Sequence, residues 1–150
     1  MSNPVVLIVD NDEDCLYIAR RALEREHVRA DVRFARNGTE ALSLLGLVDD
    51  HLGPPINLVA VFLDLNMPGV NGLEVLRRVR ENACTKDLPV VVVSTSSRSS
   101  DLRLSYRYGA NSYVVKRFEP AGPGRYLAQA VRYWCELNHV TGRAPTGNDS

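Results

Sequence analysis

Runs of apolar residues recur along the chain and alternate with segments in which polar and apolar residues are mixed. Three of these runs are continuous and rich in β-branched residues, as in strands that are buried on both faces of a sheet. Two further segments complete the series, one with the alternation of a half-buried strand. The pattern predicts five strands, at residues 4–9, 30–35, 57–65, 88–94 and 112–116.

After each predicted strand, apolar residues recur every three or four positions, which is the spacing of an amphipathic helix. These segments predict helices at 12–26, after Asn37, at 73–81, near 99–108 and at 124–138. In the first helix, the stripe that we expect to face the sheet consists of Cys15, Ile18, Ala19, Ala22 and Leu23.

The alternation of buried strands and helices predicts an α/β fold, a single-domain (βα)5 arrangement with a doubly wound, parallel five-stranded sheet. In such sheets, ligands bind beyond the carboxyl ends of the strands. Four polar residues close apolar runs at that edge, namely Asp10, Asp64, Ser94 and Lys116. We therefore expect the functional site to be built around these four side chains.

Composition narrows the class of protein. A length of 150 residues favours one domain. Lysine plus arginine and aspartate plus glutamate both number 18, and this zero net charge argues against a dedicated nucleic-acid-binding protein. No apolar run approaches the ~18 residues that a membrane-spanning helix needs, and no signal peptide precedes the first strand. The three cysteines lack metal-binding spacing and indicate reduced thiols in a cytoplasmic protein.

Two carboxylates, a hydroxyl and a lysine at one edge of a sheet suit phosphoryl chemistry. A carboxylate can attack phosphorus and carry an acyl phosphate. Mg²⁺ prefers hard oxygen ligands and neutralises a transferring phosphoryl group. Lysine and serine can bind phosphate oxygens by charge and by hydrogen bonds. The four strand-end residues fit this single chemistry together, although none of them is specific alone.

Around these positions the sequence resembles the CheY-like receiver domain of bacterial two-component response regulators. The resemblance covers about residues 4–138 and rests on Asp10, on "FLDLNMPGVNG" around Asp64, on "VVVVSTSS" around Ser94 and on "GANSYVVKRF" around Lys116. It implies the flavodoxin-like strand order 2-1-3-4-5. It also implies a signalling protein, not an enzyme, that accepts a phosphoryl group on Asp64 from a sensor histidine kinase.

The resemblance further implies roles for the neighbouring residues. Mg²⁺ or Mn²⁺ would be held at Asp10, Asn11, Asp64 and Asn66, the last through its backbone carbonyl. Ser94 and Lys116 would bind the phosphoryl group. Ser94 and Tyr113 would form the switch, with the aromatic ring turning inward on activation.

Two positions depart from the family pattern. The first strand usually ends in two consecutive acids, whereas here Asn11 follows Asp10. An amide oxygen brings no charge, so we expect weaker Mg²⁺ binding, and we expect Asp12 to cap the first helix. Lys116 is followed by Arg117, where the family usually has proline after a cis bond. A cis bond before a non-proline residue costs about 2.5–4 kcal/mol, which favours a trans bond here or a strained cis bond held by the site.

Surface residues suggest partners. In the helix near 99–108, Leu102 and Tyr106 form one stripe, and Leu104 and Tyr108 form another about 200° away. One stripe must face the sheet, so the other is expected to be exposed. We predict a homodimer through a face that consists of Leu104, Tyr108, Tyr126, Tyr133 and Leu137.

The domain boundaries and partners follow from the same resemblance. Residues 1–138 form the predicted receiver, and 139–150 a flexible tail without an output domain, so output would require a downstream effector or a phosphotransfer protein. The loop at 49–57 and the terminal helix with "YWCELN" resemble receivers that partner phytochrome-type histidine kinases, including bacteriophytochromes. We do not expect the protein to bind nucleic acid or a membrane.

Two other functions remain open at this point. A pseudo-receiver would keep the fold and bind partners without phosphorylation, and Asn11 and Arg117 are the features that favour it. A phosphatase with an aspartyl nucleophile would need an acid two residues after Asp64, where Asn66 stands instead. A dinucleotide-binding domain is set aside, because no G-x-G-x-x-G follows the first strand.

Overall fold

The computed structural model describes residues 3–48, 53–55 and 57–139. The tail predicted at 139–150 lies almost entirely outside the described residues, as does most of the loop at 49–57. The features inferred from those two segments therefore stay predictions.

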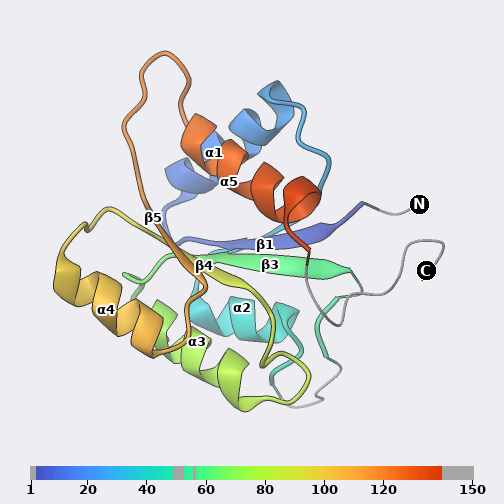
Figure 1. The fold of residues 1–150 in the computed structure, drawn as a ribbon, viewed down its shortest axis with the longest axis vertical. Helices are drawn as coiled ribbons and strands as arrows, with labels where there is room; N and C mark the ends of the chain where they lie inside the picture. The colour runs from blue at the N-terminus through green and yellow to red at the C-terminus, as the bar shows by residue number, and fades with distance from the viewer. Residues whose placement is uncertain (1–2, 49–52, 56, 140–150) are drawn as a thin grey trace.

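Five parallel strands form one sheet in the order β2-β1-β3-β4-β5, as the sequence predicted (Figure 1). The strands are β1 (Val5–Val9), β2 (Asp31–Ala35), β3 (Leu58–Leu63), β4 (Val90–Ser94) and β5 (Ser112–Val115). Every residue of β1 and β4 is buried, in keeping with their continuous apolar sequences, whereas β2 alternates along an edge of the sheet. β2 lies on one side of β1, whereas β3, β4 and β5 follow on the other side, so the switch point of the strand order lies between β1 and β3.

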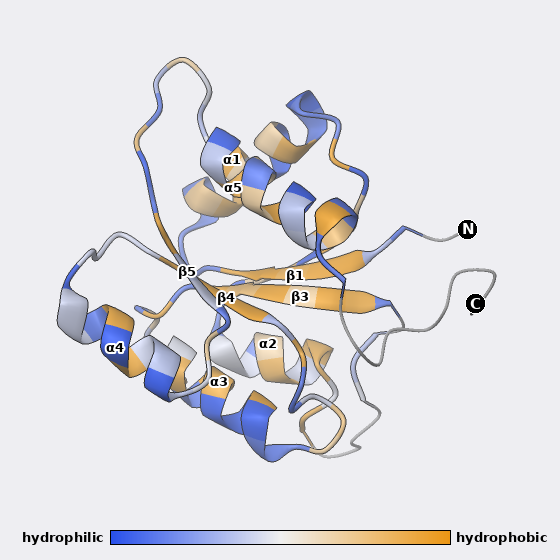
Figure 2. Cartoon of the chain, viewed as in Figure 1, coloured by the Kyte–Doolittle hydropathy of each residue, from blue (hydrophilic) through white to orange (hydrophobic). Residues whose placement is uncertain are grey.

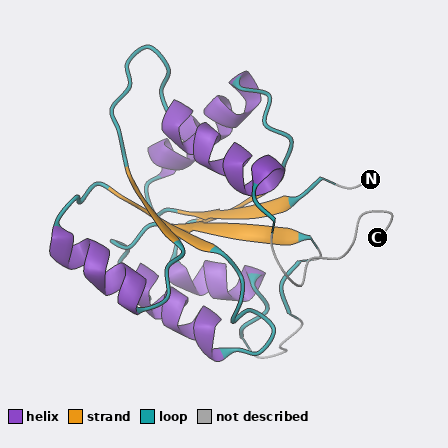
Figure 3. Ribbon diagram, viewed as in Figure 1, coloured by secondary structure: helices purple, strands orange, loops and turns teal. Residues whose placement is uncertain are grey.

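Helices cover both faces of the sheet (Figures 1 and 3). On one face lie α1 (Glu13–Arg25) and α5 (Arg125–Arg132), and on the other lie α2 (Gly38–Leu44), α3 (Gly72–Glu81) and α4 (Ser99–Arg107). A single π-helical turn, η1 (Tyr133–Leu137), extends α5. Among the described residues, no helix is long and apolar enough to cross a membrane.

The sheet separates two apolar cores (Figure 2). Because successive side chains of a strand point to opposite faces, Val6 and Ile8 of β1 pack with α1 and α5, while Leu7 and Val9 pack with α2 and α3. Each face thus has its own set of buried residues. Because the strands are packed on both faces, the positions of their ends are well defined, and so are those of the polar residues that follow them.

The buried face of α1 differs from the prediction. Leu16 is buried with Ala19, Ala22 and Leu23, while Ile18 is 40% exposed. Asp12 caps the helix, accepting a hydrogen bond from the Asp14 amide, as the sequence predicted. The helix is therefore turned so that Leu16, not Ile18, faces the sheet, and Cys15 is half-buried beside it.

The prediction for α4 was also wrong in part. The fully buried residue of this helix is Ser105, whose hydroxyl donates a hydrogen bond to the Asp101 carbonyl at 2.8 Å. Because that bond satisfies the hydroxyl, a serine can occupy the face toward the sheet. Leu102 is half-buried, and both predicted stripes leave apolar side chains in solvent, namely Leu104, Tyr106 and Tyr108.

One arginine joins the loops at the amino edge of the sheet. The guanidinium of Arg80, at the end of α3, donates hydrogen bonds to the carbonyls of Gly109, Lys86 and Leu88 and to the side chain of Asn111. Asn111 in turn accepts a hydrogen bond from the first amide of β4. The starts of β4 and β5 are thus fixed relative to each other.

Candidate functional site

Hydrogen bonds between neighbouring strands hold the backbone of three predicted site residues. The amide of Asp10 donates to the last carbonyl of β2, the amide of Asp64 to the carbonyl of Val9, and the amide of Lys116 to the carbonyl of Ser94. The distances from nitrogen to oxygen are 3.0, 3.0 and 2.7 Å. Each of these residues extends the parallel ladder by one step, so their side chains emerge together at the carboxyl edge.

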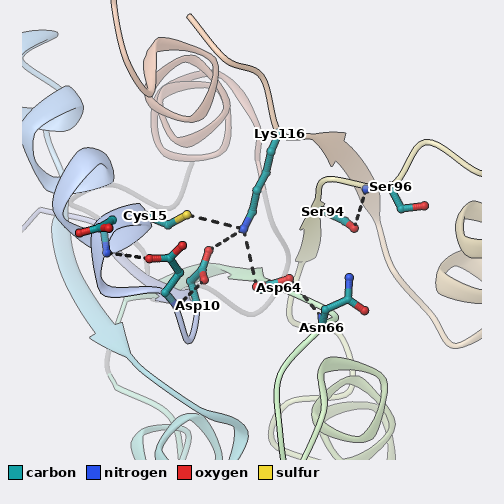
Figure 4. A network of polar contacts seen from close by, with 9 residues as sticks. Asp10, Cys15, Asp64, Asn66, Ser94, Ser96 and Lys116 are labelled. Atoms are coloured by element: carbon teal, nitrogen blue, oxygen red, sulfur yellow. Dashed lines mark hydrogen bonds and ion pairs between the residues drawn. The ribbon is translucent and has the colours of Figure 1, made fainter.

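The side chains of Asp10, Asp64 and Lys116 form one polar network (Figure 4). The Lys116 ammonium lies 2.8 Å from a carboxylate oxygen of Asp10 and 3.6 Å from one of Asp64. Both carboxylates are buried, at 6% and 7% exposure. The other Asp10 oxygen accepts from the Asp12 amide at 2.9 Å, and Asp64 accepts from the Asn66 amide at 3.1 Å.

The glycines of the "MPGVNG" segment explain why this block follows Asp64. A side chain at Gly72 would place its first carbon 2.3 Å from the Asp64 carbonyl, so only glycine lets the start of α3 approach so closely. Gly69 has φ of +72°, a conformation that glycine adopts at no steric cost. Asn71 then caps α3, accepting from the Glu74 amide at 3.0 Å. The segment fixes the turn directly after Asp64.

Burial and charge shift the ionisation of the network. Burial raises the pKa of Asp64 to about 6, the nearby charge of Asp10 adds to the rise, and the Lys116 ammonium opposes it. Burial alone would lower the pKa of Lys116, but the hydrogen bond to Asp10 and the two negative charges raise it above its ordinary value. The site therefore contains a firmly protonated cation between two acids.

Ser94 and Tyr113 are linked through one loop residue. Ser94 is buried, and its hydroxyl oxygen accepts from the Ser96 amide at 3.1 Å. The hydroxyl of Tyr113, which is half-buried, donates to the Ser96 carbonyl at 2.8 Å. The two residues proposed as a switch thus both hydrogen-bond to the backbone of Ser96. Ser96 lies in the "VVVVSTSS" segment, and its role was not predicted from the sequence.

The oxygen atoms near Asp64 are hard ligands of the kind that Mg²⁺ and Mn²⁺ prefer. Asn11 and Asn66 are exposed beside the two buried carboxylates. Among the described residues, no group of three or more histidine, cysteine, aspartate or glutamate side chains is placed to hold a metal. The set fits a divalent cation if the amide of Asn11 or backbone oxygens complete it, and the ligand assignment stays a prediction.

Two features beside the network are the peptide bond after Lys116, which the sequence left open, and Cys15, which was not predicted to lie there. The described residues contain no cis peptide bond, so the bond between Lys116 and Arg117 is trans, one of the two forms expected.

The thiol of Cys15 lies 3.9 Å from the Lys116 ammonium, and burial raises the pKa of this thiol to about 11. The sequence signal for a position near the site was the spacing, because Cys15 follows Asp10 by five residues and lies in the first turn of α1, directly after that strand end.

The residues of the predicted dimer face do not share one environment. Leu104, Tyr108, Tyr133 and Leu137 are exposed, at 37%, 39%, 47% and 69%. Tyr126 is instead half-buried and lines a cavity beside Lys116. Its ring is therefore less exposed than the other four side chains, and the dimer face stays a prediction.

Residues 6–122 match the response regulator receiver domain family. A curated relative, described as the probable methanogenesis regulatory protein FilR2 of Methanothrix harundinacea, is 32% identical over 141 residues, covering 93% of this chain and 89% of that protein. The response regulator Rcp1 of Synechocystis is 31% identical over 118 residues, covering 77% of this chain and 79% of Rcp1.

Solved structures agree with these relatives. The Mn²⁺-bound form of Rcp1 superposes with a TM-score of 0.77 at 25% identity, over 91% of this chain and 98% of that one. The bacteriophytochrome response regulator AtBRR superposes with a TM-score of 0.69 at 32% identity, over 89% of this chain and 95% of AtBRR. With its five-stranded order, its paired acids and its lysine, the chain belongs to the response regulator receiver domain family of two-component signalling.

Proposed function

We propose that Asp64 accepts a phosphoryl group from a sensor histidine kinase. The observation that carries this proposal is the position of Asp64, a buried carboxylate at the sheet's switch edge with the Lys116 ammonium 3.6 Å away. An ionised carboxylate oxygen attacks phosphorus, and the phosphohistidine nitrogen leaves with the electron pair of the broken bond. Lys116 then neutralises charge on the phosphoryl oxygens, and the hydroxyl of Ser94 can donate to one of them.

The same proposal assigns the metal ligands. Asp10, Asp64, the backbone carbonyl of Asn66 and the amide of Asn11 would hold Mg²⁺ or Mn²⁺, in line with the Mn²⁺-bound form of Rcp1. When bound, the cation neutralises the negative charge that gathers on the transferring group. Lys116 meanwhile partly offsets the repulsion between the two acids. The bond to Asp10 keeps the lysine at the site before the phosphoryl group arrives.

The kinase partner is proposed to be of the phytochrome type. Support comes from AtBRR and from a phosphorylated cyanobacterial phytochrome response regulator, RcpA, which superposes with a TM-score of 0.77 at 26% identity. Signalling then proceeds by protein–protein contacts. The exposed residues of α4 and η1, led by Tyr108 and Leu137, are proposed to join two copies of the chain.

The test is incubation of the full chain with Mg²⁺ and acetyl phosphate, followed by intact-mass analysis. We expect an adduct of about 80 Da, the mass of an added phosphoryl group. It should be lost in Asp64→Asn and retained in the matched control Asp12→Asn, whose carboxylate caps α1. A chain that stays unmodified at millimolar Mg²⁺ would instead support a pseudo-receiver that binds partners without phosphorylation.

A further inference from the structure

A cavity of about 270 Å³ lies on the α1 side of Lys116. The loop from Arg117 to Gly124 rises past α1 before α5 begins, and the cavity lies where the loop, α1 and α5 meet the strand ends (Figure 1). Asp64 is on the opposite side of Lys116, toward Asn66 (Figure 4). The cavity is thus a neighbour of the proposed phosphorylation site and shares one side chain of that site's network.

The walls of the cavity are mainly apolar, with the polar groups at one end. The apolar side chains include Leu16, Ile18, Ala19, Phe62, Pro123 and Leu127. Water within such walls lacks the two to four polar partners that hold a buried water in place. An apolar group that replaces such poorly held water gains affinity. The volume exceeds that of a roughly 150 Å³ cavity that binds benzene, so one ring with a short substituent fits.

The polar end offers a hydrogen-bond donor. An ammonium carries three N–H groups, and the described residues give Lys116 one close oxygen acceptor, Asp10 at 2.8 Å. Asp64 lies at 3.6 Å, and the contact toward the cavity is the Cys15 sulfur at 3.9 Å, which is a weak acceptor. An oxygen atom of a bound molecule can therefore accept from Lys116 without displacing Asp10.

The charges around the cavity indicate an uncharged ligand. Two acids, Asp10 and Glu119, and two cations, Lys116 and Arg117, line it, so their formal charges cancel. An anionic ligand at Lys116 would meet the Asp10 carboxylate, which lies 2.8 Å from that ammonium, and a cationic ligand at Asp10 would meet the ammonium. A neutral molecule with a single acceptor oxygen meets no such opposition.

We propose that this cavity binds a small uncharged molecule that consists of a ring-sized apolar body and one hydrogen-bond acceptor oxygen directed at Lys116. This inference goes beyond the proposed phosphorylation and does not depend on it, because the cavity is present in the unmodified chain. If Asp64 is phosphorylated, the ligand and the phosphoryl group contact the same ammonium from two sides. Lys116 is then the side chain that connects the cavity with the proposed phosphorylation site.

The test uses benzyl alcohol and benzene, two probes that share a ring and differ in the oxygen. Each is titrated into the ¹⁵N-labelled full chain, and amide shifts are followed by NMR. For benzyl alcohol we expect saturable shifts confined to the amides around the cavity, with a dissociation constant on the order of 1 mM. Benzene should bind about fivefold more weakly, because it cannot accept from Lys116.

Two variants on α1 locate the binding. Ile18 lines the cavity, and its side chain lies close to Gly124 across the mouth, so Ile18→Trp should fill the mouth and weaken benzyl alcohol at least tenfold. Tyr17→Trp is the matched control, because Tyr17 is 59% exposed and does not line the cavity. The affinity of Tyr17→Trp for benzyl alcohol should stay within twofold of that of the native chain. In Lys116→Met, the difference between the two probes should disappear.

Several results would overturn the proposal. Shifts that rise linearly with probe concentration, or that scatter over the surface, would show that no small-molecule site exists and would leave the cavity to a side chain of a docked protein. Equal affinity of Ile18→Trp and Tyr17→Trp would place the binding elsewhere. Equal affinity of the native chain for benzene and benzyl alcohol would remove the role of Lys116. None of these readouts requires phosphorylation, so failure here is separable from failure of the phosphorylation test.

Discussion

The Lys116 ammonium is hydrogen-bonded to Asp10 at 2.8 Å and not to Asp64, whose nearer oxygen is 3.6 Å away. The lysine is thus attached to the acid of β1 while it faces the proposed acceptor at the end of β3. A small movement of its flexible chain toward Asp64 is enough to transfer the contact.

Replacing Asp64 by asparagine should stabilise the metal-free protein at neutral pH. Because the folded-state pKa of about 6 lies above the ordinary 3.8, the folded chain binds a proton that the unfolded chain has already released. Stability therefore falls as pH rises from about 4 to about 6. At pH 7.5, in EDTA, Asp64→Asn should gain about 1–3 kcal/mol, the lower end reflecting solvent screening.

The measurement for Asp64→Asn is urea unfolding at pH 7.5 and pH 4.5. The gain should fall to about a third at the lower pH, where Asp64 is protonated in the folded chain and still mostly ionised in the unfolded chain. Asp12→Asn serves as the control, since asparagine caps a helix about as well as aspartate. A gain of equal size at both pH values would contradict an origin in the buried charge.

Replacing Asn11 by aspartate should tighten Mg²⁺ binding about tenfold, because a further carboxylate adds charge beside Asp10 and Asp64. Isothermal titration calorimetry measures the affinity directly. Glu13→Gln is a suitable control, since Glu13 is exposed in the first turn of α1 and pairs with Arg36 at 3.1 Å. An unchanged Mg²⁺ affinity in Asn11→Asp would show that this position does not face the metal.

Replacing Arg80 by methionine should destabilise the fold by about 2–4 kcal/mol. The substitution keeps much of the apolar stem and leaves the carbonyls of Gly109 and Leu88 without their donor. Chemical unfolding of Arg77→Met provides the comparison on the same helix. Arg77 pairs with two acids at the surface, so its loss should leave stability nearly unchanged. Similar losses in both variants would refute a special role for Arg80.

Replacing Tyr113 by phenylalanine removes the hydrogen bond to the Ser96 carbonyl and keeps the ring. We expect a loss of about 0.5–1.5 kcal/mol in thermal or urea unfolding, the usual net value of one such bond. Tyr17→Phe, at an exposed position on α1, should be close to neutral. If Tyr113→Phe is equally neutral, the hydroxyl does not hold the segment after β4.

Replacing Tyr108 by glutamate should convert the proposed homodimer into a monomer, because a charge would be placed on an apolar face of α4. Light scattering at several protein concentrations gives the mass. Tyr17→Glu introduces the same charge at an exposed position of α1 that is not part of the proposed dimer face, and it should leave the mass unchanged. An identical mass for the native chain and Tyr108→Glu would remove this face as an interface.

The strand ends could be predicted from sequence because one rule places them: a polar residue that closes a buried apolar run lies at the edge of the sheet. Asp10, Asp64 and Ser94 follow that rule, and Lys116 closes the half-buried apolar run of β5. Helix orientation could not be predicted equally well. In α4 the buried position belongs to Ser105, and hydropathy does not register a hydroxyl that is satisfied within its own helix.

The contact between Cys15 and Lys116 was not predicted for a different reason. It joins residues separated by 101 positions, so no short-range pattern connects the two side chains. For the peptide bond before Arg117, the energy cost of a non-proline cis bond left two possibilities, a trans bond or a strained cis bond. The structure shows the trans bond. Short-range rules thus predicted which residues reach the site, and tertiary packing decided which of them touch.

The division of the interior by the sheet has a consequence for how this sequence can change over time. Substitutions on the α1 and α5 face share no buried partners with those on the α2 and α3 face. Effects of distant substitutions without common partners add almost independently. Each side can therefore accumulate changes without compensation from the other, so one face can adapt to new partners while the opposite face preserves the fold.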